Sequence, residues 1–208
     1  LEPAISLRGE IAHAGSSERD GEIALALPKV SLASLFDAFA NILPRSLQEA
    51  TAAGNVAVDG KLRIKGKQAA VTGEMTLEGG SLEVPGQKLS VVAINGAIPF
   101  SLDFSGKAAS KPPEKLSFSR ENYPRLLQAM QQPVIEKHIL TIGKIRYGTT
   151  EFATTTLAIR AGNGLTEISS LASGLFQGAL LGRCFFRFQG GAQYGVDILV
   201  HDLSLREV

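Results

Sequence analysis

The feature that most constrains the fold of this chain is a two-residue period of apolar side chains, which recurs along most of its 208 residues. Alternate residues of a strand lie on one face of a sheet, so each such run predicts a strand with one apolar and one polar face. The runs cover 5–11, 23–27, 56–65, 71–77, 98–104, 139–147, 152–160, 184–189 and 196–205. They predict a mainly β protein, an elongated and twisted antiparallel meander that turns about every ten residues.

Glycine, proline and serine mark the predicted turns between these strands, because they accept backbone conformations that other residues avoid. The sequence predicts turns at 15–17, 66–67, 79–80 and 85–86.

Two segments break the period of two and predict short amphipathic helices. The first is expected near 31–52: Ser31 caps it, apolar residues follow at three-and-four spacing, Pro44 interrupts it, and a second short piece covers 46–53. The second is expected near 120–132, with Pro124 in its first turn and Pro133 preventing its continuation.

Small residues, lysines and paired prolines predict an exposed connection at 107–117. It divides the chain into 1–106 and 118–208, each with a helix and strands, which is typical of two repeats of one sheet. Because the chain opens on Leu1 and ends in an alternating run, we expect it to be a piece of a longer protein.

Composition excludes several classes of function. The formal net charge is +1, which disfavours a dedicated nucleic-acid binder. The longest uncharged stretches, 89–102 and 168–182, are shorter than the roughly 20 residues that a membrane-spanning helix needs. The single cysteine, Cys184, can form neither an internal disulfide nor a cysteine-based zinc site. No metal or cofactor is expected.

No catalytic motif is present, so we do not expect an enzyme. The three histidines, His13, His138 and His201, are far apart in sequence. His201 and Asp202 are neighbours, and on a strand their side chains should point to opposite faces rather than form a dyad. Cys184 lies among arginines that could activate a thiol, but such a cysteine is more often a small apolar residue of a strand face.

The apolar strand faces pose the main functional question, because two short helices do not cover them. Either the sheet curls over itself or packs on other parts of the protein, or the face is a groove for lipid tails. The groove candidates are Val56, Val58, Leu62, Ile64, Val71, Met75, Leu77, Ile98, Phe100, Leu102, Phe104, Phe186, Phe188, Val196, Ile198 and Val200. The opposite positions, such as Asp59, Lys61 and Arg63, are expected to face water.

Two passages resemble the AsmA-like proteins of Gram-negative envelopes. The first passage begins with a helix that ends at Leu43–Pro44. A short helix and Ala53–Gly54 follow, and they lead into the amphipathic strands around 55–66. The second is similar to the C-terminal passage of the family, in which a glycine-flanked strand precedes further alternating strands: 140–143, 147–148, 157–159, 175–182 and 194–205. Gln177 departs from the pattern, which has a small residue there. TamB-like and YdbH-like proteins share this sequence pattern. Together the two matches cover most of the chain.

The resemblance implies a β-groove in a periplasmic segment that is tethered to the inner membrane. It further implies that the groove carries phospholipid acyl chains between the inner and outer membranes, which are contacted through other parts of the protein. The alternative is a structural or scaffolding β-domain of the envelope, serving outer-membrane assembly or homeostasis without conducting lipid.

Overall fold

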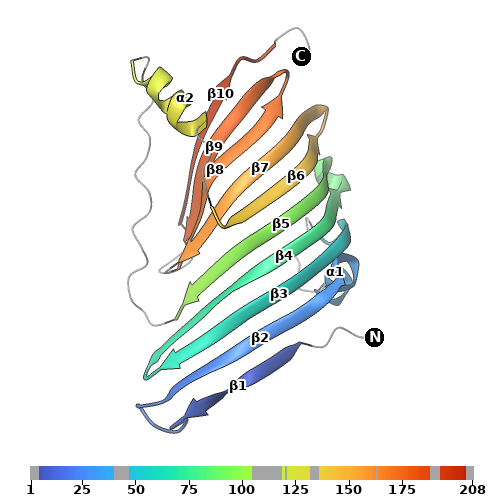
Figure 1. Cartoon of the computed structure of the whole chain (residues 1–208). Helices are drawn as coiled ribbons and strands as arrows, with labels where there is room; N and C mark the ends of the chain where they lie inside the picture. The colour runs from blue at the N-terminus through green and yellow to red at the C-terminus, as the bar shows by residue number, and fades with distance from the viewer. Residues whose placement is uncertain are drawn as a thin grey trace.

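A computed structural model describes residues 5–39, 47–104, 119, 121–131, 136–162, 164–187 and 193–204. The chain forms one ten-stranded antiparallel sheet whose strands stand in sequence order from β1 to β10 (Figure 1). The strands are β1 (Ser6–Ala12), β2 (Asp20–Ser31), β3 (Thr51–Lys65), β4 (Gln68–Val84), β5 (Leu89–Asp103), β6 (His138–Tyr147), β7 (Thr150–Gly162), β8 (Leu165–Leu175), β9 (Gly178–Arg187) and β10 (Gln193–His201). The predicted antiparallel meander is confirmed.

Two α-helices interrupt the meander, α1 (Leu32–Phe39) and α2 (Tyr123–Gln131), and a 3-10 turn, η2 (Pro85–Gln87), joins β4 to β5. Of the helix expected near 31–52, the described residues show α1 over Leu32–Phe39. Residues 40–46 lie outside the described part, and the second helical piece is wrong over 51–53, because these residues already belong to β3. Within the second predicted range, α2 follows a reciprocal pair of hydrogen bonds between Ser119 and Asn122.

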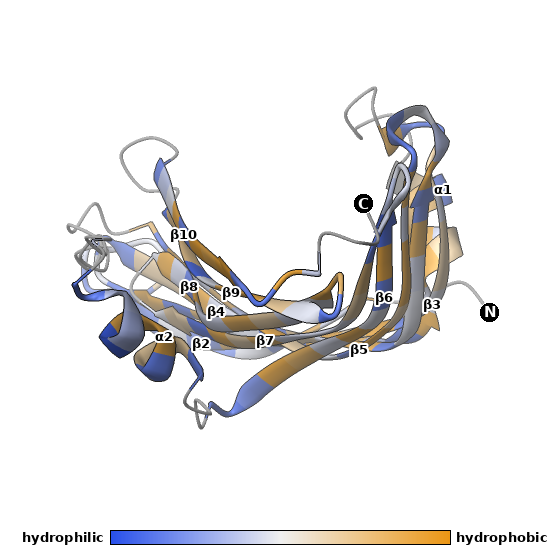
Figure 2. Cartoon of the chain, turned by 90° about the horizontal axis from the view of Figure 1, so that it is seen from above, coloured by the Kyte–Doolittle hydropathy of each residue, from blue (hydrophilic) through white to orange (hydrophobic). Residues whose placement is uncertain are grey.

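The sheet has one apolar face and one polar face. Directly paired residues of neighbouring strands share a face, and the row Val58, Met75 and Ile98 runs apolar across β3, β4 and β5. One residue along, the row Asp59, Glu74 and Pro99 lies on the other face. The sheet curves into a trough, and α2 lies outside it (Figure 2). On β9, α2 lies near Arg183, which the strand pairing puts on the face opposite to the Val58 row. Because α2 lies outside the trough, the apolar face is the concave one.

A line of bulges crosses the strands and bends the sheet into this trough. Gly54 in β3 (φ +97°) lies against Gly79 and Gly80 in β4, where any added Cβ would come within 2.5 Å of the Gly79 carbonyl oxygen. The next strands continue the line with Ala93 in β5 (φ +57°) beside Gly143 in β6. Since each bulge bends its strand, aligned bulges form a crease. The turn predicted at 79–80 is therefore wrong, whereas those at 15–17, 66–67 and 85–86 are confirmed.

The core lies on the concave face. Val56, Leu77, Leu140 and Ile159 are buried and form one cluster, although they come from β3, β4, β6 and β7. Two residues of α1, Leu32 and Leu35, pack against this cluster beside Val30. The helix thus covers the apolar face where β2 ends and β3 begins.

The sheet is continuous across the boundary predicted between two repeats. Residues 89–96 of β5 pair with 140–147 of β6, while residues 97–103 pair only with β4 among the described strands. Pro99 lies in this last part, where a residue without an N–H group is tolerated at a strand edge. The division into 1–106 and 118–208 stays a prediction, and the connection at 107–117 lies outside the described residues.

Candidate functional site

The predicted groove residues converge on one surface. Every candidate within the described strands has its side chain on the concave face, from Ile64 and Leu62 in β3 to Val196, Ile198 and Val200 in β10. Phe104 follows the end of β5 and is 63% exposed. Phe188 lies outside the described residues. The strand pairing therefore places candidates from both halves of the sequence on the same side of one sheet.

Exposure divides this concave face into a packed part and an open part. Val56 is 2% exposed and Leu77 is 8% exposed, so both are core residues. Leu102, Val196 and Ile198 are between 43% and 55% exposed. The concave face thus has a packed middle and an open, solvent-exposed margin along β9 and β10.

Phe100 shapes the floor of the concave face beside the open end of β5. Phe100 is paired with Gly73 of β4, which is paired with Gly60 of β3, and the Phe100 ring lies over both glycines. A Cβ on Gly73 would approach the ring Cζ within 2.4 Å, so only glycine leaves room for the ring there. The role of these glycines was not predicted from the sequence, although glycines that face an aromatic residue across neighbouring strands are a recognisable signal.

One buried polar pair interrupts the apolar floor in the second half. Thr155 and Ser173 face each other across β7 and β8, and their hydroxyl oxygens are 2.7 Å apart. Thr155 also donates to the Ala153 carbonyl. The pair satisfies its own hydrogen-bonding groups, as buried polar groups must. Neither residue stands out in the sequence, because a single threonine or serine within an alternating run is common.

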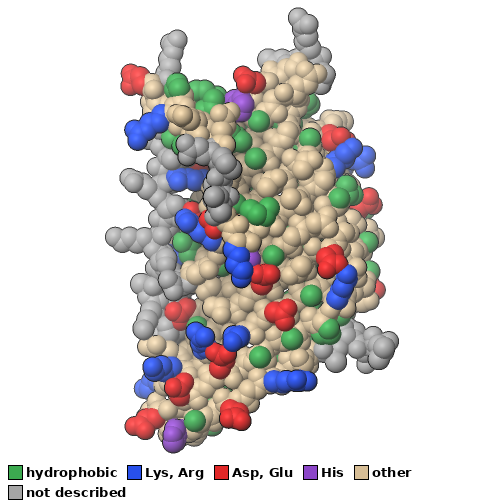
Figure 3. All heavy atoms as spheres, viewed as in Figure 1, with side chains coloured by type: hydrophobic (Ala, Val, Ile, Leu, Met, Phe, Trp, Pro, Cys, Tyr) green, Lys and Arg blue, Asp and Glu red, His purple; other side chains and the backbone are tan. Residues whose placement is uncertain are grey.

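The convex face carries the charges of the first half. Figure 3 views this face and shows Lys, Arg, Asp and Glu side chains dispersed over it. Glu22 accepts hydrogen bonds from Lys61 (2.7 Å) and Arg63 (2.9 Å) on the next strand. These bonds lower the pKa of the Glu22 carboxyl from its ordinary value of 4.5. The predicted wet positions on β3 therefore lie on the polar face.

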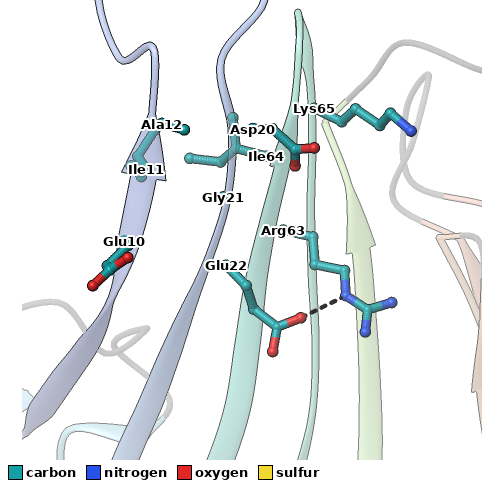
Figure 4. Close-up of a pocket in the computed structure, with 9 residues that line it drawn as sticks. All are labelled: Glu10, Ile11, Ala12, Asp20, Gly21, Glu22, Arg63, Ile64 and Lys65. Carbon is teal, nitrogen blue, oxygen red and sulfur yellow. Dashed lines mark hydrogen bonds and ion pairs between the residues drawn. The ribbon is translucent and has the colours of Figure 1, made fainter.

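A shallow hollow formed by β1, β2 and β3 is lined by residues of both faces of the sheet (Figure 4). Ile11, Gly21 and Ile64 are paired in one row, and a Cβ on Gly21 would come within 2.4 Å of the Glu10 carbonyl oxygen. One residue along, Glu22 and Arg63 are paired on the opposite face. The hollow contains no buried polar group without a partner among the described residues that line it.

The histidines do not gather into one site. His13 lies in the β1–β2 turn, and His138 contacts Glu74, with Nε2 2.7 Å from Oε2. The expectation that His201 and Asp202 point to opposite faces is wrong. Asp202 follows the end of β10 in the left-handed region (φ +54°), which brings its Oδ2 within 3.0 Å of His201 Nδ1. Strand alternation does not extend to this residue, so the two side chains can meet.

Cys184 lies on the concave face between Ile168 and Val196. Burial raises the pKa of its thiol, which favours the unreactive protonated form. In the described part of the chain, no three His, Cys, Asp or Glu side chains gather closely enough to hold a metal ion.

No family model, curated protein or solved structure matches the chain. Among the described helices, none has the length and apolar character required to cross a membrane.

Proposed function

We propose that the concave face holds the acyl chains of phospholipids, and that the chain is the trough-forming segment of an AsmA-like envelope protein. The observation that supports this most directly is the open apolar margin of β9 and β10. Phe186, Tyr194, Val196, Ile198 and Val200 lie there side by side, each at least 40% exposed. A contiguous exposed apolar surface of this kind normally marks a binding surface.

Burial of an acyl chain against this margin is favourable without any catalytic group. Each methylene removed from water contributes roughly 0.8 kcal/mol. The packed cluster around Val56 and Leu140 leaves less room in the middle, so the tails lie along the open walls and the headgroup lies at the wet rim. The protein acts as a carrier, with no cofactor, no metal and no nucleic-acid partner.

The resemblance supplies the proposed setting. The segment lies in the periplasm, tethered to the inner membrane by other parts of the protein, and phospholipid moves along the trough between the inner and outer membranes.

Photo-crosslinking tests the proposed lipid surface. A photoreactive amino acid is placed in cells at Ile198 or Leu102 on the concave face, and at Asp59, Lys61 or Arg63 on the convex face. We expect phospholipid, identified by mass spectrometry, to be trapped from the concave positions only. Crosslinks from the convex positions alone would show that the faces have been assigned the wrong way round.

A substitution pair tests whether the same surface binds lipid in the purified protein. Ile198→Asp puts a charge on the open margin, whereas Thr72→Asp puts the same charge on the convex face. Both positions are solvent-accessible, so both variants should fold. We expect co-purifying phospholipid to fall severalfold in Ile198→Asp and to be unchanged in Thr72→Asp. If the unsubstituted protein carries no phospholipid, the scaffolding alternative is favoured instead.

A further inference from the structure

Two bulges on neighbouring strands meet at Asn95, in the crease of the sheet. Where β4 pairs with β5, residues 78–79 stand opposite Asn95 alone. Directly beyond them, residues 92–93 of β5 stand opposite Ser81 alone. Each bulge bends its strand and interrupts the hydrogen bonds of the ladder, so backbone N–H and C=O groups in the crease need other partners.

The side chain of Asn95 supplies a partner to each bulge. The Gly79 N–H donates to Asn95 Oδ1 (2.7 Å), and Asn95 Nδ2 donates to the Ala93 carbonyl oxygen (3.1 Å). Gly79 and Ala93 are the residues with positive φ in the two bulges, at +60° and +57°. An amide side chain carries an acceptor oxygen and a donor nitrogen together, so one residue can bind a backbone group on each strand.

Asn95 lies on the convex side of the crease. It pairs with Thr141, whereas the next pair, Gly96 with the core residue Leu140, belongs to the concave side. Gly96 has a φ of +126°, and a Cβ there would lie 2.0 Å from the Ile139 carbonyl oxygen, so the backbone beside Asn95 is tightly placed. The two amide hydrogen bonds therefore hold the outer side of the bend and occupy no space inside the trough.

We infer that Asn95 is a positioning residue, which sets the angle between the two walls of the trough. The walls are the parts of the sheet on either side of the crease. Two bulges that relaxed independently would let the walls swing, whereas a side chain bonded to both couples them into one fixed bend. Since the bend decides how closely an acyl chain is enclosed, Asn95 also controls lipid retention, and this consequence alone rests on the proposed function.

Distances between two spin labels measure the angle. In a Cys184→Ser background, nitroxides on Lys67→Cys and Gln87→Cys label exposed turns at the two ends of β4, which crosses the crease. We expect a narrow distance distribution in this parent protein. In Asn95→Ala it should broaden roughly twofold and shift to longer distances, because a strand that bends less is longer from end to end. Thr141→Val is the matched control, since it removes a side-chain hydrogen bond to the Asn95 carbonyl (3.2 Å) that joins no bulge. An unchanged distribution in Asn95→Ala, or equal broadening in both variants, would overturn the inference.

Amide hydrogen exchange tests the two bonds separately. Asn95→Asp keeps an acceptor for the Gly79 N–H but has no donor for the Ala93 carbonyl at neutral pH. Exchange of the Gly79 amide should become roughly tenfold faster in Asn95→Ala and much less so in Asn95→Asp. Equal acceleration in the two variants would show that the bond to Oδ1 does not hold the bulge.

Co-purifying phospholipid, measured for each chain by mass spectrometry, tests the consequence for the trough. We expect it to fall severalfold in Asn95→Ala and to be unchanged in Thr141→Val. Spin-label distances that change while the lipid content does not would contradict the inferred control of lipid retention. A parent protein without any phospholipid would contradict the proposed function instead, and the distance measurement would still decide whether Asn95 sets the angle of the walls.

Discussion

The two halves of the sheet differ on their convex faces, although both follow the same two-residue period. In β1–β5 this face is charged and wet, and Glu22 binds Lys61 and Arg63 through side chains that are 41% or more exposed. In β6–β10 the same face includes the buried residues Leu181 and Leu199, and α2 lies against β9 there. The ion pair Arg183–Asp197 is correspondingly more enclosed, at 24% and 18% exposure.

The difference shows that alternation specifies which residues share a face but not whether that face meets water. A helix placed over one half changes the environment of positions that the period alone would assign to solvent. The first half is therefore a one-sided sheet, whereas the second half approaches a sheet covered on both sides. Substitutions that carry the same charge to equivalent faces of the two halves measure this difference.

The largest effect is expected within the concave face itself. Val56→Asp buries a carboxylate in the core cluster, where it has neither water nor a cationic partner among the described side chains. We expect the free energy of unfolding to fall by about 4 kcal/mol or more. Val196→Asp, on the open margin, should change it by less than about 1 kcal/mol. Chemical denaturation measures both, and similar losses would mean that the margin is also core.

The second prediction compares the two convex faces. Leu199→Asp should destabilise the protein by about 3 kcal/mol, because Leu199 is only 5% exposed. Thr72→Asp introduces the same charge on the convex face of the first half, at an exposed position paired with Lys61, and should have an effect within about 0.5 kcal/mol. Thermal unfolding of the two variants measures the contrast. Equal shifts would remove the distinction between the halves.

A smaller effect is expected at the polar pair in the floor of the second half. Thr155→Val leaves the buried Ser173 hydroxyl without its side-chain partner, at a cost of about 1–2 kcal/mol. The double variant Thr155→Val, Ser173→Ala removes both polar groups and should recover part of that loss. A double-mutant cycle from denaturation curves measures the coupling, and strictly additive losses would show that the two hydroxyls do not interact.

The smallest effect is expected at Glu22, because its pair with Lys61 and Arg63 is exposed and screened by salt. The folded-state pKa of Glu22 is lowered, so the carboxylate adds stability above the ordinary value of 4.5 and loses that contribution as the pH falls through the folded-state pKa. We expect a slight advantage over Glu22→Gln at pH 7 that decreases as the pH falls below 4.5 and as the salt concentration rises. A larger advantage at pH 3 than at pH 7 would reverse the assigned sign.

Local sequence determined the faces of the strands. Because side chains alternate with a period of two, the sequence alone places the apolar residues from Val56 to Ile64 on one face of their strand, and likewise those from Val196 to Val200. The hairpin at 66–67 and the middle of α2 were predictable for a similar reason, since turn residues and three-and-four spacing act over a few neighbours.

Tertiary structure alone decided where the sheet bends, what covers it and which apolar residues remain open. The crease needs Gly54, Gly79 and Ala93 to lie in one line across the strands, and residues this far apart in sequence are aligned only by strand pairing. The burial of Leu199 likewise depends on the convex side of its strand being covered, and the 2% exposure of Val56 depends on neighbours from β6, β7 and α1. Period and propensity are local properties, whereas burial is set by contacts between distant segments, which a single sequence does not specify.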